Sequence, residues 1–97
     1  MRSLVVTVPA SQDLEEISDY FLDVSIDAGE RFVEGFNKKC QYLARYPYID
    51  KSYAQLKPGL RGISLVNHII FYRVLEERIE ILRVISGHRN LQDIFAE

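Results

Sequence analysis

Apolar residues in the first 24 positions follow a strand pattern and then a helix pattern. The run RSLVVTV at residues 2–8 is short and rich in β-branched residues, which is typical of a strand that Pro9 would end. Ser11 can then cap an amphipathic helix whose acidic first turn suits the positive end of the helix dipole. The acidic residues of that turn are Asp13, Glu15 and Glu16. The apolar stripe of the helix consists of Leu14, Ile17, Phe21 and Val24.

A second helical pattern begins after a brief break and ends before Pro47. Asp27 and Glu30 have the spacing of a capping pair at its start. Its apolar stripe consists of Phe32, Phe36, Cys40 and Leu43. Because each helix has one polar face and the connection is short, we expect the two helices to pack as an antiparallel hairpin.

The second half of the chain changes to the pattern of strands. Residues 46–59 have turn residues and no clear period, and three β-rich runs follow them: LRGISL, HIIFYRVL and RIEILRVIS. Only Val66-Asn67 and Glu76-Glu77 separate these runs, and gaps this short allow only antiparallel hairpins. The final segment, NLQDIFAE, predicts a short terminal helix.

These patterns predict a single α+β domain over residues 1–97, since a chain of this length has room for one core. The expected order is an N-terminal strand, an antiparallel helical hairpin, a three-stranded antiparallel meander and a short C-terminal helix. The helices would cover one face of a mostly antiparallel sheet.

A two-residue turn at Glu76-Glu77 would fix which residues face each other across the last hairpin. The expected pairs are Arg73 with Glu80, Phe71 with Leu82, and Ile69 with Val84. One face would then carry His68, Ile70, Tyr72 and Val74 against Ile85, Arg83, Ile81 and Ile79. Both faces are apolar, and one helical hairpin covers only one of them. The terminal helix, the loop or another molecule must cover the other.

Charge is distributed unevenly between the two halves of the chain. The formal net charge is -2, with 47% hydrophobic and 27% charged residues, which is the composition of a folded protein. Residues 1–50 hold five Lys or Arg against nine Asp or Glu, whereas residues 51–97 hold seven against five. The second half is therefore where an anionic partner would bind, if the protein has one.

The sequence does not contain the residues that several kinds of catalytic or metal site require. Cys40 is the only cysteine, so no internal disulfide and no thiolate metal cluster can form. The sequence has no glycine-rich phosphate loop, no metal-spaced set of ligands and no nucleophile with a base at a recognisable spacing, so we expect no metal and no cofactor. The first apolar run is too short for a signal peptide and no window approaches a membrane span, so we expect a cytoplasmic protein.

Cations of the sheet and of the segment after it are the candidate binding residues. The predicted register places Arg61 beside Tyr72 and brings Arg83 to the same face, while His88 and Arg89 follow the last strand. Arginines on a sheet face suit bidentate contacts to phosphate or carboxylate. The simpler alternative is that each arginine is a surface residue, with its aliphatic part packed on the protein and its guanidinium group in water. His88 is either a general base or a solvated side chain.

Five strings spread over the chain resemble those of one family: DLEEISDYF, GERFVEGF, PGLR, IIFYRV and ILRVISGHRNL. Together with the order of elements, they resemble the RelE/ParE superfamily of bacterial type II toxins, often described as plasmid stabilisation proteins. RelE-like members of that superfamily cleave messenger RNA on the ribosome, and ParE-like members poison DNA gyrase. Both are neutralised by an antitoxin whose disordered tail folds over the toxin.

The resemblance is nearer to the ParE branch. The ribonuclease branch has an arginine three residues before the tyrosine of the matching strand, where this chain has Ile69 before Tyr72. That branch also uses an aromatic hydroxyl near the chain end, where this chain has Phe95. Arg89 does match a ribonuclease arginine, and His88 lies near the place of a catalytic histidine. A net charge of -2 fits poorly with binding inside ribosomal RNA.

The resemblance therefore implies a ParE-like toxin that inhibits gyrase by binding, cuts no bond itself and is neutralised by a cognate antitoxin. Its target-binding residues would be Arg61, Arg83, His88 and Arg89, with the C-terminal segment. The alternative is a RelE-like endoribonuclease with His88 and Arg89 as its catalytic candidates. The second alternative is a non-toxic member that only binds its antitoxin. In each case the antitoxin tail would cover the second apolar face of the sheet.

Overall fold

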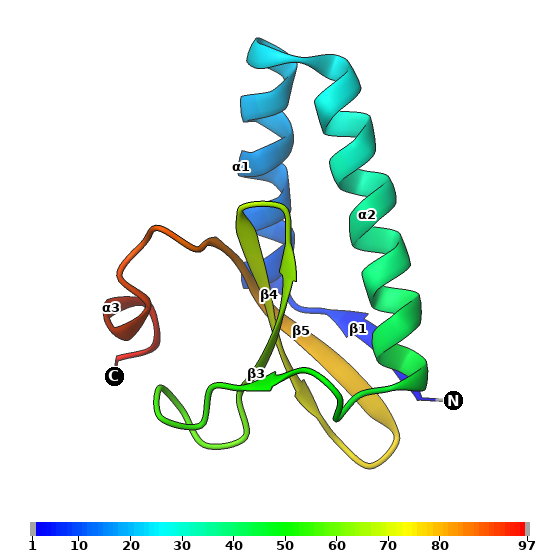
Figure 1. Ribbon diagram of the computed structural model, residues 1–97, viewed down its shortest axis with the longest axis vertical. Coiled ribbons are helices and arrows are strands. Elements are labelled where there is room, and N and C mark those ends of the chain that lie inside the picture. The colour runs from blue at the N-terminus through cyan, green and yellow to red at the C-terminus, as the bar shows by residue number, and fades with distance from the viewer. Residues whose placement is uncertain (1, 97) are drawn as a thin grey trace.

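The computed structural model describes residues 2–96 and shows a helical hairpin packed on one face of a five-stranded sheet (Figure 1). The elements in chain order are β1 (Ser3–Val6), α1 (Val8–Val24), α2 (Ile26–Arg45), β2 (Lys51–Ser52), β3 (Arg61–Leu65), β4 (His68–Val74), β5 (Arg78–Ser86) and α3 (Leu91–Phe95). The strand order is β1-β5-β4-β3-β2, with β1 parallel to β5 and the other neighbours antiparallel. The expected α+β order is confirmed, and β1 and β2 extend the predicted meander at its two edges.

Helix α1 begins earlier than the sequence predicted, because Pro9 lies in its first turn and does not end a strand. A proline fits there, since the first N–H groups of a helix have no partner within the helix. Thr7 is the N-cap in place of Ser11. The Oγ1 of Thr7 accepts from the N–H of Ala10 at 3.4 Å and donates to the carbonyl of Ile81 at 2.8 Å. The acidic residues expected in the first turn therefore lie further along the helix.

One residue, Ser25, separates α1 from α2 and caps both helices. Its N–H donates to the carbonyl of Phe21 at 2.8 Å, and its Oγ accepts from the N–H of Ala28 at 3.2 Å. Ser25 thus replaces the predicted capping pair, Asp27 and Glu30, which lie within α2. The two helices run in opposite directions from this corner, as expected (Figure 1). Among residues 2–96, no helix combines the length and the apolar character of a membrane span.

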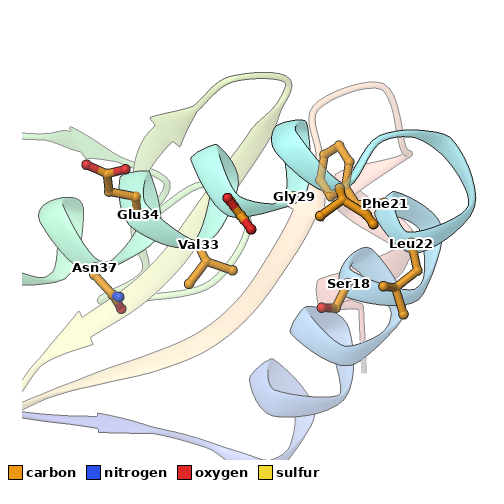
Figure 2. A pocket seen from close by; sticks show the side chains of 9 residues that line it. Ser18, Phe21, Leu22, Gly29, Val33, Glu34 and Asn37 are labelled. Atoms are coloured by element: carbon orange, nitrogen blue, oxygen red, sulfur yellow. The ribbon is translucent and has the colours of Figure 1, made fainter.

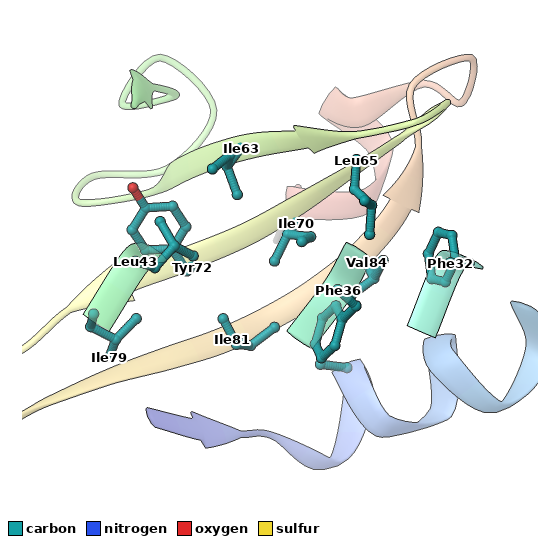
Figure 3. Packing of buried hydrophobic residues seen from close by; sticks show 11 residues of the cluster. Phe32, Phe36, Leu43, Ile63, Leu65, Ile70, Tyr72, Ile79, Ile81 and Val84 are labelled. Atoms are coloured by element: carbon teal, nitrogen blue, oxygen red, sulfur yellow. The ribbon is translucent and has the colours of Figure 1, made fainter. Parts of the chain in front are cut away.

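The main core lies between the hairpin and the sheet (Figure 3). Phe32, Phe36 and Leu43 of the predicted α2 stripe are at most 8% exposed. The sheet contributes Ile63, Leu65, Ile70, Tyr72, Ile79, Ile81 and Val84. From α1, Leu14, Ile17 and Phe21 pack against this core. Val24 was predicted in the same stripe but is 61% exposed, because it is the last residue of α1 and lies beyond the edge of the core.

The opposite face of the sheet is covered within the chain. Leu60, Phe71 and Ile85 are buried there. The centre of the Phe71 ring lies 5.0 Å from that of Tyr53 in the loop and 4.8 Å from that of Phe95 in α3. The sequence left three candidates for covering this face: the terminal helix, the loop or another molecule. The loop and the terminal helix are the ones that cover it. This face therefore does not need an antitoxin tail to remove it from water.

A β-bulge shifts half of the β4–β5 register by one residue. The observed pairs are Tyr72 with Ile81, Arg73 with Glu80, Phe71 with Arg83, and Ile69 with Ile85. The pairs nearest the turn, such as Arg73 with Glu80, are those predicted. Phe71 and Ile69 were predicted to face Leu82 and Val84, but each faces the next residue along β5 instead. An extra residue on one strand has this effect, because it turns the following side chains to the other face. Val84 thus faces the helices, and Ile85 faces α3.

Candidate functional site

Arg61, at the start of β3, holds the loop that follows α2. Its Nη2 donates to the carbonyls of Tyr48, at 2.8 Å, and Asp50. The guanidinium also lies 5.6 Å from the centre of the Tyr48 ring. Tyr72, its predicted neighbour across the strands, donates its hydroxyl to the carbonyl of Pro47 at 2.9 Å. Burial raises the pKa of Tyr72, so this hydroxyl stays protonated as a donor.

Arg83, in β5, forms a bidentate ion pair with Asp13 of α1. The Arg83 Nε lies 2.7 Å from Oδ2 of Asp13, and Nη2 lies 2.9 Å from Oδ1. Oδ2 also accepts from the N–H of Val84 at 2.9 Å. Asp13 is only 7% exposed, and its hydrogen bonds raise the pKa of Arg83. A helix that began after Ser11 would have placed Asp13 in a solvated first turn, which is why this partner was not expected.

His68, at the start of β4, packs against Phe32 of α2 with ring centroids 5.2 Å apart. Burial lowers the pKa of His68, and its Nδ1 has no hydrogen-bond partner among the described residues. The side chains predicted to share one face are Arg61, His68, Tyr72 and Arg83. For Arg83 this prediction is wrong, because the bulge sets it opposite Phe71, on the face that α3 covers, and its side chain reaches Asp13 of α1 from there. The other three contact α2 or the loop after α2, so the four side chains do not form one open basic surface.

The segment that connects β5 to α3 presents an exposed histidine and an exposed arginine. His88 and Arg89 are both exposed, and their N–H groups bond to Ser86 at 3.3 and 3.1 Å. Arg89 lines a shallow cavity of about 420 Å³ together with Arg83, Asn90, Asp93 and Ile94. The cavity thus joins two of the residues that the sequence selected for target binding.

The groups around this cavity are suited to binding an anion. Two guanidinium groups can donate hydrogen bonds to a phosphate or a carboxylate. Asp13, paired with Arg83, and Asp93, in the cavity lining, reduce the positive charge. Within residues 2–96, no three His, Cys, Asp or Glu side chains are grouped in a way that could hold a metal ion.

An apolar groove between α1 and α2 is a second candidate surface, which the sequence did not reveal (Figure 2). It has a volume of about 450 Å³, and Leu22, Ile26 and Val33 in its lining are 68%, 63% and 52% exposed. Gly29 lets the helices approach here, because a Cβ at this position would lie 3.0 Å from the Cβ of Phe21. Exposed apolar side chains gathered in a groove are typical of a protein-binding surface.

The charged residues that the structure describes along this groove are acidic. Glu30 and Glu34 line it, and Glu15 and Asp19 line the adjoining part of about 490 Å³. Neither lining includes a Lys or Arg among the described residues. The groove therefore suits an apolar segment that carries basic side chains. Its sequence signal was the group of apolar residues around the helix junction that fall outside either predicted stripe, such as Leu22 and Ile26.

Comparisons with known proteins agree with this fold. Residues 4–91 match the family model described as ParE toxin of type II toxin-antitoxin system, parDE. The chain is 33% identical over 88 residues to Toxin ParE1 of Mycobacterium tuberculosis, which covers 88% of this chain and 90% of that protein. It is 28% identical over 95 residues to Toxin ParE3 of Caulobacter vibrioides, with 94% and 92% covered.

A solved structure shares the fold at lower sequence identity. A chain of the chromosomal ParDE TA system from P. aeruginosa superimposes with a TM-score of 0.75 at 24% identity, covering 89% of this chain and 96% of that one. The resemblance to the RelE/ParE superfamily, and to its ParE branch in particular, is thereby confirmed. By its sequence over residues 4–91, the chain belongs to the ParE family of type II toxins.

Proposed function

We propose that this protein inhibits DNA gyrase by binding to it, and that a cognate antitoxin neutralises it. Membership of the ParE family over residues 4–91 is the observation that carries the proposal. The ParE-like proteins that the chain resembles poison gyrase without known catalytic residues. This agrees with a candidate site whose described residues offer hydrogen-bond donors and include no nucleophile paired with a base.

The segment from the end of β5 to α3 is the target contact that we propose. His88 and Arg89 are exposed there, and Arg83 lines the same cavity as Arg89. Guanidinium groups at a protein surface suit the carboxylates of a protein target. Arg61 is the fourth residue of the proposed contact. Because its guanidinium already donates to two carbonyls of the loop after α2, we expect its contribution to be the smallest.

An endoribonuclease of the RelE type is the second candidate, because His88 and Arg89 are adjacent and both exposed. There they would stabilise the cleaved phosphate while the 2'-hydroxyl attacks. Two positions argue against it. Phe95 takes the place of an aromatic hydroxyl, and its ring packs on Phe71 at 4.8 Å. Ile69 takes the place of an arginine, and it packs in the apolar cluster beneath α3.

The antitoxin is proposed from the family and from the groove between α1 and α2. Exposed apolar side chains bordered by carboxylates make this hairpin a suitable surface for a protein partner. A member that kept only this interaction, without toxicity, is the third candidate. Expression without antitoxin separates it from the others, since growth would continue. Gyrase and ribosomes are in the bacterial cytoplasm, where we also place this protein.

Supercoiling of relaxed plasmid by purified gyrase tests the proposal. We expect the purified toxin to inhibit supercoiling and to cause cleaved DNA to accumulate. Arg89→Ala should weaken the inhibition about tenfold, as expected for an arginine at the centre of a contact. The matched control is Arg31→Ala, an exposed arginine of α2, which should change it by less than about twofold. Normal supercoiling at a large excess of folded toxin would exclude gyrase as the target.

Cleavage of messenger RNA on translating ribosomes tests the second candidate. A ribonuclease would produce cuts at fixed codon positions, and Arg89→Ala would abolish them. Intact messenger RNA, at toxin concentrations that stop supercoiling, would rule the ribonuclease out.

A further inference from the structure

Part of the sheet face opposite the helical hairpin is uncovered beside the turn between β4 and β5. We call it the arginine patch, and its residues are Ser3, Val5, Arg73, Arg78 and Glu80. Their neighbours along the strands face the helices, so alternation directs these five side chains to the opposite face. α3 covers the part of that face toward the other end of β5 (Figure 1), so the patch is open to solvent.

Glu80 holds both arginines of the patch in place. Its Oε1 accepts from Nε of Arg73 at 2.6 Å, and its Oε2 accepts from Nε of Arg78 at 2.9 Å. The Glu80 side chain is only 12% exposed. The hydrogen bonds from Arg73 and Arg78 lower the pKa of Glu80, so the carboxylate stays ionised at neutral pH. Each guanidinium group is thus fixed through one of its three nitrogen atoms.

The outer nitrogen atoms of both guanidinium groups are available to a ligand. In the described chain, the hydrogen bonds of the Arg73 and Arg78 side chains come from Nε alone. The two side chains are 51% and 48% exposed. Nη1 and Nη2 of each group can therefore still donate. Because the patch has two guanidinium groups and a single carboxylate, it keeps an excess of positive charge for an anion.

The carboxylates nearest to the patch in sequence have cations of their own. Glu76 and Glu77, in the turn between β4 and β5, line a polar hollow of about 740 Å³ together with Arg2 and Arg45. This hollow lies against the C-terminal end of α2, whereas the patch is on the face opposite the helices. Two carboxylates and two guanidinium groups balance each other there.

We propose that Arg73 and Arg78 bind a backbone phosphate of the DNA that gyrase holds. A guanidinium group donates two parallel hydrogen bonds to phosphate oxygens, and two such groups fixed side by side suit one phosphate. The patch and Arg83 are on the same face of the sheet, roughly 15 Å apart along β5. One side of the toxin can therefore contact both the enzyme and its DNA. This inference rests on the proposed inhibition of gyrase and adds a second contact to it.

The composition of the patch favours a phosphate backbone over a protein surface. Val5, which is 42% exposed, is the one large apolar side chain among its five residues. The centre of a protein interface usually buries several apolar or aromatic side chains. Contacts to a nucleic-acid backbone are instead polar, and arginine is one of their main donors. A duplex therefore suits this patch better than a protein partner.

The affinity of the toxin for gyrase, with and without a bound DNA duplex, tests the contact. Titration calorimetry measures the binding of the full-length toxin to gyrase alone and to gyrase loaded with the duplex. For the wild type, the duplex should tighten binding about tenfold. For Arg73→Gln combined with Arg78→Gln, the duplex should tighten binding less than about twofold. The plot of log affinity against log salt concentration should also become shallower by about one unit.

The control removes the same amount of charge elsewhere. Arg31→Gln combined with Lys38→Gln changes two exposed cations of α2 and should leave the effect of the duplex within about twofold of the wild type. In the patch variant, glutamine keeps an N–H donor for Glu80 at both positions. Both altered side chains are also exposed, so this variant should keep its circular dichroism spectrum.

Each outcome separates this inference from the function on which it rests. A duplex effect that the patch variant retains in full overturns the inference and leaves gyrase binding standing. A patch variant that loses as much affinity for gyrase alone identifies carboxylates of the enzyme as the ligand, and this also overturns the inference. A wild-type toxin that binds neither form of gyrase refutes the proposed function itself.

Discussion

The carboxylate of Asp13 accepts three hydrogen bonds, two from Arg83 and one from the backbone N–H of Val84. It connects the middle of α1 to the irregular part of β5. A carboxylate this deeply buried is tolerated because each of its oxygens has a donor. It also keeps Arg83 beside the cavity that we propose as part of the target contact.

Removal of this carboxylate should destabilise the protein strongly. Asp13→Ala leaves Arg83 and one backbone N–H without their partner, and we expect a loss of about 3 kcal/mol in the free energy of unfolding. Denaturant unfolding followed by circular dichroism measures it. Glu16→Ala, at an exposed position of the same helix, should cost less than about 0.5 kcal/mol. Similar losses in the two variants would contradict the role given to Asp13.

The half-buried imidazole of His68 should make stability depend on pH. Burial lowers the pKa of His68 in the folded state below its ordinary value of 6.5. The folded protein then holds this proton less tightly than the unfolded chain, so stability is lost as the pH falls. Between about pH 7 and about pH 5, the free energy of unfolding should fall more steeply in the wild type than in His68→Gln. Parallel slopes would show that His68 is not shielded in the folded state.

Among the elements, α2 carries the largest share of the helix side of the core. Phe36, only 8% exposed, lies on its buried face, and Phe36→Ala should reduce the free energy of unfolding by about 3 to 5 kcal/mol. Val33→Ala is the control on the same helix, because Val33 is 52% exposed and should matter little. Chemical denaturation of the two variants provides the comparison. A loss below about 1 kcal/mol for Phe36→Ala would mean that α2 is packed differently.

Elements whose signals are local were predictable from the sequence. The stripes of the two helices and the short gaps of the meander each reflect which side of an element is buried. The start of α1 was not predictable, because a proline such as Pro9 is compatible with either the end of a strand or the first turn of a helix. The contact between Thr7 and Ile81 decides this, and it joins segments distant in sequence. The bulge in the β4–β5 pairing was not predictable either, because the length of the turn fixes only the pairs next to it and says nothing of an extra residue further along the strand.

On the scale of the whole molecule, the candidate site was only partly predictable. His88 and Arg89 were recognisable because they follow the last strand directly, and the structure leaves both exposed. Arg61 and Arg83 appeared equivalent to them in sequence. Their guanidinium groups are instead engaged by a loop and a helix that fold back from elsewhere in the chain. Their contacts depend on how the layers pack, which composition and spacing do not specify.

Charge is separated over the molecule in a way that the net value of -2 conceals. The groove of the helical hairpin is lined by carboxylates, whereas the cavity beside the segment after β5 is lined by two arginines and one aspartate. These two surfaces share no lining residue. An antitoxin and a target can therefore be recognised through different chemistry on one small domain.

Induced expression in bacteria that lack the antitoxin tests the central claim most directly. Growth, chromosome morphology and total protein synthesis are followed in the same culture, with Arg89→Ala as the comparison. We expect growth to stop and cells to form filaments while protein synthesis continues, and we expect Arg89→Ala to weaken these effects. An immediate halt in protein synthesis, or growth that continues unchanged, would contradict a toxin directed at gyrase.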